Sequence, residues 1–383
     1  MIMKKIVCFA LNAAMALSLC ACASSGGTVS DAETEGGTPF VEVLDPFLET
    51  GGGGTDSEED DGFNYLREMN PGLFTEDYID FEKHNVSSTS IDNLQVKANG
   101  ESCSEEAPVT YRGGEMEISF TATVDTPAND HSDGYMVFID GTPQIISLNG
   151  SEPSDMAIIE GKNGDTEERT IRFTPRLTKE NIADKDDLGL TLIAMDNPLY
   201  TAFGTVAHFD FNYRKAFKHF PFKLEGDCET IELAFGKSFE NYVYRDSEVI
   251  NYLPVNPSEL ESDTKELMPV YFDLCSTTKE KPVIRDGKAD ITLVLYGGKQ
   301  TTPLPYKVYF YVNHEPVKID GCDYIAAELK YGFAAKYTTT VDNLKDGDIV
   351  YAIAIAENIF SVDGIYRDDW VEPTVTKRLL AAD

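Results

Sequence analysis

Short runs of alternating apolar and polar residues, separated by Gly, Pro, Asn and Asp, constrain the fold of this chain more than any other feature. A first series of such runs comprises Met116 to Thr123, Tyr135 to Ile139, Arg169 to Thr174 and Leu188 to Met195. A second series comprises Asp290 to Tyr296, Lys307 to Val312, Ala335 to Val341 and Asp348 to Ala356. A period of two residues is typical of antiparallel strands. No long amphipathic helix separates the runs, so the sequence predicts an all-β fold and disfavours a parallel α/β fold.

The two series resemble each other when one is shifted along the chain onto the other. One constant shift without a gap places Ile118 on Ile291, Ile139 on Val312 and Pro143 on Pro316, among other similar pairs. Further downstream, a different shift aligns Ala194–Asn197 with Ile355–Asn358. We interpret this as two related β domains. Chance resemblance stays open as the alternative, because strands and turns use a limited set of residue types.

Each unit resembles an immunoglobulin-like β-sandwich, with seven or eight candidate strands in roughly 100 to 125 residues. The Cys and Trp arrangement of antibody domains is missing, because the single Trp, Trp370, lies beyond both Cys275 and Cys322. Both faces of the run from Asp348 to Ala356 are apolar, which predicts a central strand that is covered on each side. The predicted architecture is two immunoglobulin-like antiparallel β-sandwich domains after a disordered N-terminal tether.

The N-terminus has the features of an exported bacterial lipoprotein. Lys4 and Lys5 precede a short apolar stretch, and the sequence Leu19–Cys22 resembles a lipobox, in which the final cysteine is acylated. The resemblance implies a covalent lipid on Cys22, and hence a protein anchored to the cell membrane on its extracellular side. Ordinary secretion with cleavage after Ala21 or Ala23 remains the alternative.

Composition places the remaining boundaries. A Gly-rich, acidic stretch follows Cys22 and predicts a flexible tether. The predicted segments are a signal peptide at 1–21, the tether at 22–62, a short helical or irregular segment at 63–89, the first sandwich at 90–216, a connector or extra strands at 217–265, and the second sandwich at 266–383.

The chain is strongly acidic, with a formal net charge of −34. Such a charge repels the phosphates of nucleic acids, so the sequence excludes a nucleic-acid-binding role. A solvated, non-adhesive surface is the simplest interpretation, and attraction of divalent cations is the alternative. Four cysteines lie beyond the signal region, and we expect them to be mostly free: Cys103, Cys228, Cys275 and Cys322.

Motif searches yield no catalytic residues and no metal ligands. His314-Glu315 is followed by Pro316 instead of a zinc-binding helix, and Gly236-Lys237-Ser238 lacks the upstream glycine of a phosphate loop. The segment Asn129–Gly134 superficially matches the start of a calcium-binding loop but has no glutamate at the twelfth position, so we interpret it as a turn. No Gly-x-Ser-x-Gly motif supports a serine nucleophile, although residue types alone leave a Ser-His-Asp site open.

Aromatic side chains are the remaining candidates for ligand binding, because exposed aromatic faces stack against sugar rings. The candidates are Trp370, Tyr366, Tyr309 and Tyr311. The alternative is that these side chains pack inside the second domain.

The leading functional hypothesis is a membrane-anchored extracellular lipoprotein whose β domains bind a partner without catalysis. The partner would be a glycan or a surface protein, and no cofactor is expected apart from the lipid on Cys22. The competing hypotheses are a cell-surface hydrolase of glycans or cell-wall polymer, and a structural spacer.

Overall fold

A computed structural model describes most of the chain beyond residue 82. Every described residue belongs to the compact unit Phe74–Asp383. The signal peptide, Cys22, the tether at 22–62 and most of the segment at 63–89 therefore lie outside the described residues. The described ranges are 83–84, 87–103, 108–128, 130–183, 188–200, 215–243, 270–275, 284–297, 303–329, 333–345, 347–357, 359, 374–376 and 379–380.

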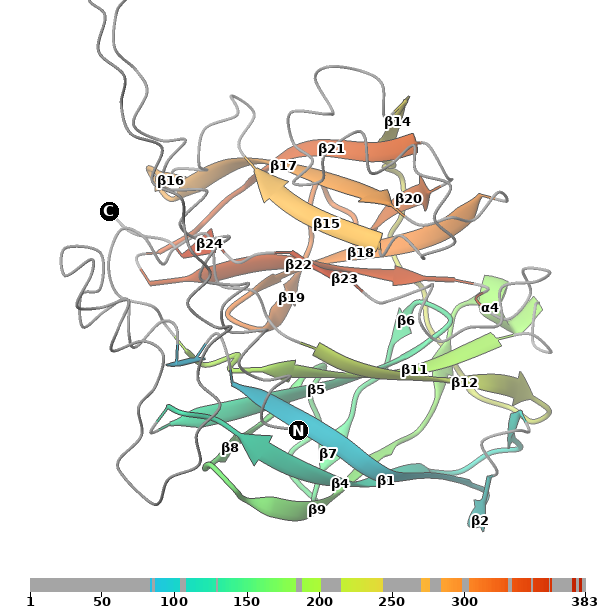
Figure 1. The fold of residues 1–383 in the computed structure, drawn as a ribbon. Helices are drawn as coiled ribbons and strands as arrows, with labels where there is room; N and C mark the ends of the chain where they lie inside the picture. The colour runs from blue at the N-terminus through green and yellow to red at the C-terminus, as the bar shows by residue number, and fades with distance from the viewer. Residues whose placement is uncertain are drawn as a thin grey trace, which may run out of the picture. The chain divides into compact units, whose positions relative to one another are not determined.

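The fold is all-β, as the sequence predicts, and consists of two β-sandwiches (Figure 1). The first sandwich pairs a five-stranded sheet of order β2-β1-β4-β9-β7 with a six-stranded sheet of order β3-β12-β11-β5-β6, in which β8 also pairs with β5. The elements are β1 (Ser88–Ala98), β2 (Glu101–Ser102), β3 (Val109–Tyr111), β4 (Met116–Asp125), β5 (His131–Ile139), β6 (Thr142–Pro143), β7 (Ser147–Leu148), β8 (Ala157–Gly161), β9 (Thr166–Phe173), β10 (Arg176–Leu177), α4 (Lys179–Ala183), β11 (Leu188–Asp196), β12 (Lys215–Leu224) and β13 (Glu229–Thr230).

The second sandwich repeats this arrangement. One sheet has the order β14-β21-β17-β15, with β16 pairing to β17, and the other has the order β19-β18-β22-β23, with β20 and β24 pairing to β18 and β22. The strands are β14 (Glu240–Val243), β15 (Val270–Cys275), β16 (Ile284–Arg285), β17 (Lys288–Gly297), β18 (Leu304–Val312), β19 (Glu315–Val317), β20 (Ile325–Leu329), β21 (Phe333–Val341), β22 (Ile349–Ala356), β23 (Thr374–Val375) and β24 (Leu379–Leu380).

Corresponding strands occupy corresponding places in the two sandwiches. The order β1-β4-β9 in one sheet matches β15-β17-β21, and β5-β11-β12 in the other matches β18-β22-β23. The shift that places Ile139 on Val312 also places His131 on Leu304, so it carries β5 onto β18 end to end. Every run of the two predicted series overlaps a strand of the structure.

The strand register corrects the downstream alignment drawn from the sequence. Tyr135 lies opposite Ala194, and its counterpart Val308 lies opposite Ala354, so Ala194 corresponds to Ala354 and not to Ile355. A slip of one residue turns every side chain to the other face of a strand. The correct alignment therefore places Asp196 at the position of Ala356.

The segment 217–265 contributes strands to both sandwiches. Strand β12 crosses residue 216 and pairs with β11, and β13 pairs with β10, so the first sandwich continues past the boundary drawn from the sequence. Strand β14 pairs instead with β21 of the second sandwich. The alternating Phe220, Phe222 and Leu224 of β12 are buried in the first core, which explains why this strand belongs there.

Each sandwich has its own apolar core. In β4, Met116, Ile118, Phe120 and Ala122 are buried and the residues between them are half-buried. The corresponding positions of β17 are buried in the second core. Burial of these alternating side chains is the main force holding the sheets of each sandwich together.

A third apolar cluster joins the outer faces of the two six-stranded sheets. It contains Phe138 and Ile193 from the first sandwich and Tyr309, Tyr351 and Ile353 from the second. Every residue of β22 is consequently buried. This confirms the prediction that the strand following Asp348 is covered on both faces.

No helix within the described part of the chain has the length and apolar character that a bilayer span requires. Cys103, Cys228 and Cys322 are free thiols.

Candidate functional site

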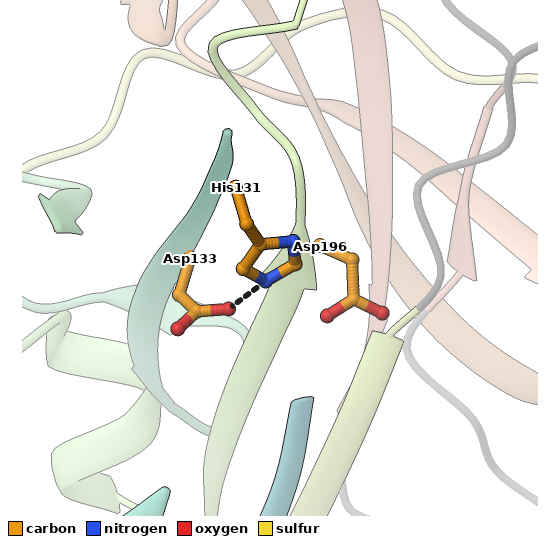
Figure 2. Close-up of side chains that lie close together, drawn as sticks. All are labelled: His131, Asp133 and Asp196. Atoms are coloured by element: carbon orange, nitrogen blue, oxygen red, sulfur yellow. Dashed lines mark hydrogen bonds and ion pairs between the residues drawn. The ribbon is translucent and has the colours of Figure 1, made fainter. Parts of the chain in front are cut away.

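A cluster of charged and polar side chains occupies one end of the first core (Figure 2). His131 and Asp133 share one face of β5, because side chains two residues apart in a strand point to the same side. Tyr135 continues that face into the apolar core. Asp196, at the end of β11, lies directly opposite Asp133 in the ladder. The two strands thus bring an imidazole and two carboxylates together.

Asp133 is held by an arginine from the opposite sheet. Arg169 of β9 is 1% exposed, and its Nη1 lies 2.6 Å from Asp133 Oδ2 and 2.5 Å from the Tyr135 hydroxyl. The guanidinium also lies over the Tyr135 ring, 5.3 Å from its centroid. A buried charge requires a partner of opposite charge, and Arg169 and Asp133 serve as partners for each other.

The other oxygen of Asp133 faces His131 and Thr89. His131 Nε2 lies 2.8 Å from Asp133 Oδ1, and the Thr89 hydroxyl donates to the same oxygen at 2.5 Å. The Thr89 backbone N–H donates to Asp196 Oδ1 at 2.9 Å. Strand β1 therefore links the two carboxylates.

These contacts decide the ionisation of Asp133. Burial alone would raise the pKa of its carboxyl, but hydrogen bonds from His131 and Thr89 and the positive charge of Arg169 lower the pKa below its usual value. Asp133 is consequently ionised at neutral pH. Burial, together with the charge of Asp133, raises the pKa of Tyr135, which stays a neutral phenol.

Two buried nitrogens of the cluster have no hydrogen-bond partner among the described residues. They are His131 Nδ1 and Arg169 Nε. The side chain of His131 is 0% exposed. Buried polar atoms without partners are rare in native proteins, and each calls for an explanation.

The second sandwich shows that the fold does not need this polar cluster. Strand correspondence places Leu304 at the position of His131, Tyr306 at that of Asp133 and Ala356 at that of Asp196. All three are buried in an otherwise apolar core. The same topology therefore packs with apolar side chains, and the charges of the first sandwich are specific to it.

A cavity of about 430 Å³ lies beside the cluster and is lined in part by His131. Glu160, Lys162 and Asp165 contribute charged groups to its wall, and Leu199 contributes an apolar side chain that is 47% exposed. This volume falls within the range of about 300 to 1,000 Å³ that is usual for small-molecule sites.

An aromatic pair forms another part of the cavity wall. The rings of His84 and Tyr200 are stacked, with centroids 3.8 Å apart. Nε2 of His84 also lies 3.1 Å from Asp130 Oδ1. His84 is 3% exposed and Tyr200 is 9% exposed, so this pair closes the wall of the cavity and offers no open ring face to a ligand.

The structure does not place the tyrosines predicted to bind ligand on an exposed face. Tyr309 is 3% exposed and donates a hydrogen bond from its hydroxyl to the Gly141 carbonyl at 2.8 Å. Tyr311 is 0% exposed and stacks on Tyr351 at 5.3 Å. Both belong to the apolar cluster between the sandwiches, so neither can stack on a sugar. The remaining predicted residues, Cys22, Tyr366 and Trp370, lie outside the described residues.

Sequence reasoning missed the polar cluster because it interpreted Asn129–Gly134 as a turn. Strand β5 begins at His131, so His131 and Asp133 are strand residues. A signal was present, because His131, Asp133 and Tyr135 alternate in phase with the apolar face that follows. Asp196 could be joined to them only once the strand pairing was known, and Arg169 only once the packing of the two sheets was known.

The comparisons with known proteins identify no family. No protein-family profile and no curated protein matches the chain. Solved structures give weak matches: red sea bream transglutaminase at 6% identity and a TM-score of 0.20, and the CupB6 tip adhesin from Pseudomonas aeruginosa at 8% identity and 0.20. The transglutaminase match covers 85% of this chain and 34% of the transglutaminase chain. The adhesin match covers 77% of this chain and 98% of the adhesin chain. A beta-glucosidase from Kluyveromyces marxianus matches at 8% identity and 0.19, over 78% of this chain and 49% of its own. The chain thus spans half or less of two of these structures, and TM-scores this low support no functional argument.

Proposed function

We propose that this chain is a membrane-anchored extracellular lipoprotein, attached through a lipid on Cys22, whose first sandwich binds a ligand without transforming it. The observation that carries the proposal is the cavity beside the charged cluster of the first sandwich. The lipobox-like sequence around Cys22 supports the anchor, and the Gly-rich acidic stretch that follows it suits a tether.

A glycan is the ligand class that the cavity favours. Carboxylates of Glu160 and Asp165 and the ammonium of Lys162 offer hydrogen bonds to sugar hydroxyls, and the exposed side chain of Leu199 offers an apolar contact. A surface protein that presents a polar loop is the alternative partner.

Hydrolysis is less well supported by the cluster. A glycosidase needs one carboxyl group whose raised pKa keeps it protonated as a general acid. Asp133 has the opposite property, since its hydrogen bonds and Arg169 lower its pKa. The spacer hypothesis, in turn, gives no reason for a charged cluster in only one of two similar cores.

The anchor is tested by the Cys22→Ala variant in cells fed with labelled palmitate. We expect the variant to lose the label and to appear in the medium, because the thiol is the acyl acceptor. The Cys20→Ala variant is the matched control and should keep the label. Persistent labelling of Cys22→Ala would contradict the anchor.

The glycan proposal is tested by applying the mature protein to a broad glycan array with and without calcium. We expect specific binding to a limited set of structures. Absence of binding both with and without calcium would contradict the glycan proposal and would direct the search to protein partners.

A further inference from the structure

His131, Asp133 and Asp196 place three potential metal ligands inside the first sandwich. One donor atom from each residue lies within 4.8 Å of the others, and all three residues are buried. An imidazole nitrogen together with carboxylate oxygens is a donor set that suits divalent first-row metals such as Zn²⁺. Calcium, which prefers six to eight oxygen ligands, suits it less well.

The hydrogen bond between His131 and Asp133 assigns a role to each ring nitrogen. Nε2 lies 2.8 Å from Asp133 Oδ1, so an N–H at this position donates to the carboxylate and the lone pair resides on Nδ1. A carboxylate that holds the far nitrogen of a metal-binding histidine is a recurring arrangement in metal sites. Arg169 and Thr89 in turn fix Asp133.

No described residue supplies a hydrogen-bond partner to His131 Nδ1, although the side chain is fully buried. Figure 2 shows Nε2 turned toward Asp133 and the other ring nitrogen on the side of Asp196. A cation between this nitrogen and the Asp196 carboxylate would bind the lone pair that the described residues leave without a hydrogen bond.

We propose that the first sandwich binds one divalent transition-metal ion through His131 Nδ1 and the Asp196 carboxylate, with Asp133 positioning the imidazole. His131 is also one of the residues that line the cavity, although its imidazole is itself buried. The fold itself does not demand these donors, because the second sandwich has Leu304 and Ala356 in place of His131 and Asp196. The proposal stands independently of glycan binding.

The test is equilibrium dialysis of the full mature protein against Zn²⁺, with the bound metal counted by mass spectrometry. We expect one tightly bound Zn²⁺ per chain that excess Ca²⁺ does not displace. The Asp196→Asn variant should bind at least about 100-fold more weakly, because losing even an outer-shell partner of a metal site costs about 10- to 100-fold. X-ray absorption of the zinc-loaded protein should show scattering from an imidazole ring.

The matched control is Asp92→Asn, which removes the same charge from an exposed position of β1. This control is necessary because a net charge of −34 attracts divalent cations to the whole surface. Equal binding by Asp92→Asn and Asp196→Asn would overturn the proposal in favour of adventitious surface binding. Absence of tight binding to the unmodified protein would overturn it in favour of a metal-free polar network.

Circular dichroism establishes that each variant is folded. If Asp196→Asn does not fold, His131→Gln replaces it, because the glutamine amide can still donate to Asp133. Retention of tight Zn²⁺ by His131→Gln, or zinc absorption spectra without an imidazole signal, would equally contradict the proposed ligands.

Discussion

Replacing Arg169 with methionine should destabilise the protein by about 3–5 kcal/mol, the usual cost of removing one partner from a buried ion pair. Arg169 and Asp133 are each 1% exposed, and their side chains lie 2.6 Å apart. Methionine fills most of the arginine volume but leaves the Asp133 carboxylate buried without its cation. Urea unfolding of the mature protein, followed by circular dichroism, measures the loss.

Arg172→Met is the matched control on the same strand. Its side chain is 46% exposed and pairs with Glu117 at 2.9 Å, on the opposite face of β9. Exposed ion pairs contribute about 0–1 kcal/mol, so this variant should lose little stability. Equal losses for Arg169→Met and Arg172→Met would show that the Arg169–Asp133 pair is not buried as described.

The alternating pattern of the sequence was sufficient to predict the strands and the all-β class. Each predicted run overlaps a strand because apolar residues at every second position had to face a core, as in β4. The rule that two apolar faces imply cover on both sides correctly predicted the burial of β22. That the two sandwiches are immunoglobulin-like stays a prediction.

The same rule, applied to β18, would have prevented the incorrect placement of the tyrosines. Val308 and Phe310 occupy one face of this strand, and Tyr309 and Tyr311 occupy the other together with Lys307, so both faces are mostly apolar or aromatic. The structure buries the second face against the first sandwich. An aromatic side chain on a strand is thus a weak sign of sugar binding unless its own face is otherwise polar.

The charged cluster could not be predicted in full from the sequence. His131 and Asp133 are neighbours along the chain, but Asp196 reaches them only through the pairing of β11 with β5, and Thr89 and Arg169 only through the packing of the opposite sheet. With 66 acidic residues in the chain, no pattern singles out Asp196. Local sequence signals therefore located the strands, and strand pairing together with the packing of the two sheets located the site.

Replacing Phe138 with alanine should cost about 3–5 kcal/mol, as for other fully buried phenylalanines. Phe138 is 0% exposed and packs on Tyr309 of the second sandwich, with ring centroids 6.1 Å apart. The stability is lost because the removed ring leaves a void in the apolar cluster that joins the two sandwiches. Thermal and urea unfolding of the mature protein measure it.

Phe235→Ala is the control for Phe138. Its side chain is 57% exposed and stacks on Tyr324 at 5.3 Å, so its loss should cost on the order of 1 kcal/mol or less. A Phe138→Ala variant as stable as Phe235→Ala would contradict the packing of the two six-stranded sheets against each other.

The most direct test of the central claim, that the ligand site lies in the cavity of the first sandwich, compares cavity variants on the glycan array. Lys162→Ala and Leu199→Ser alter the wall of the cavity, and Lys288→Ala alters an exposed lysine of the second sandwich. We predict that both cavity variants lose the binding of the unmodified protein and that Lys288→Ala keeps it. Binding that survives in both cavity variants would contradict the claim.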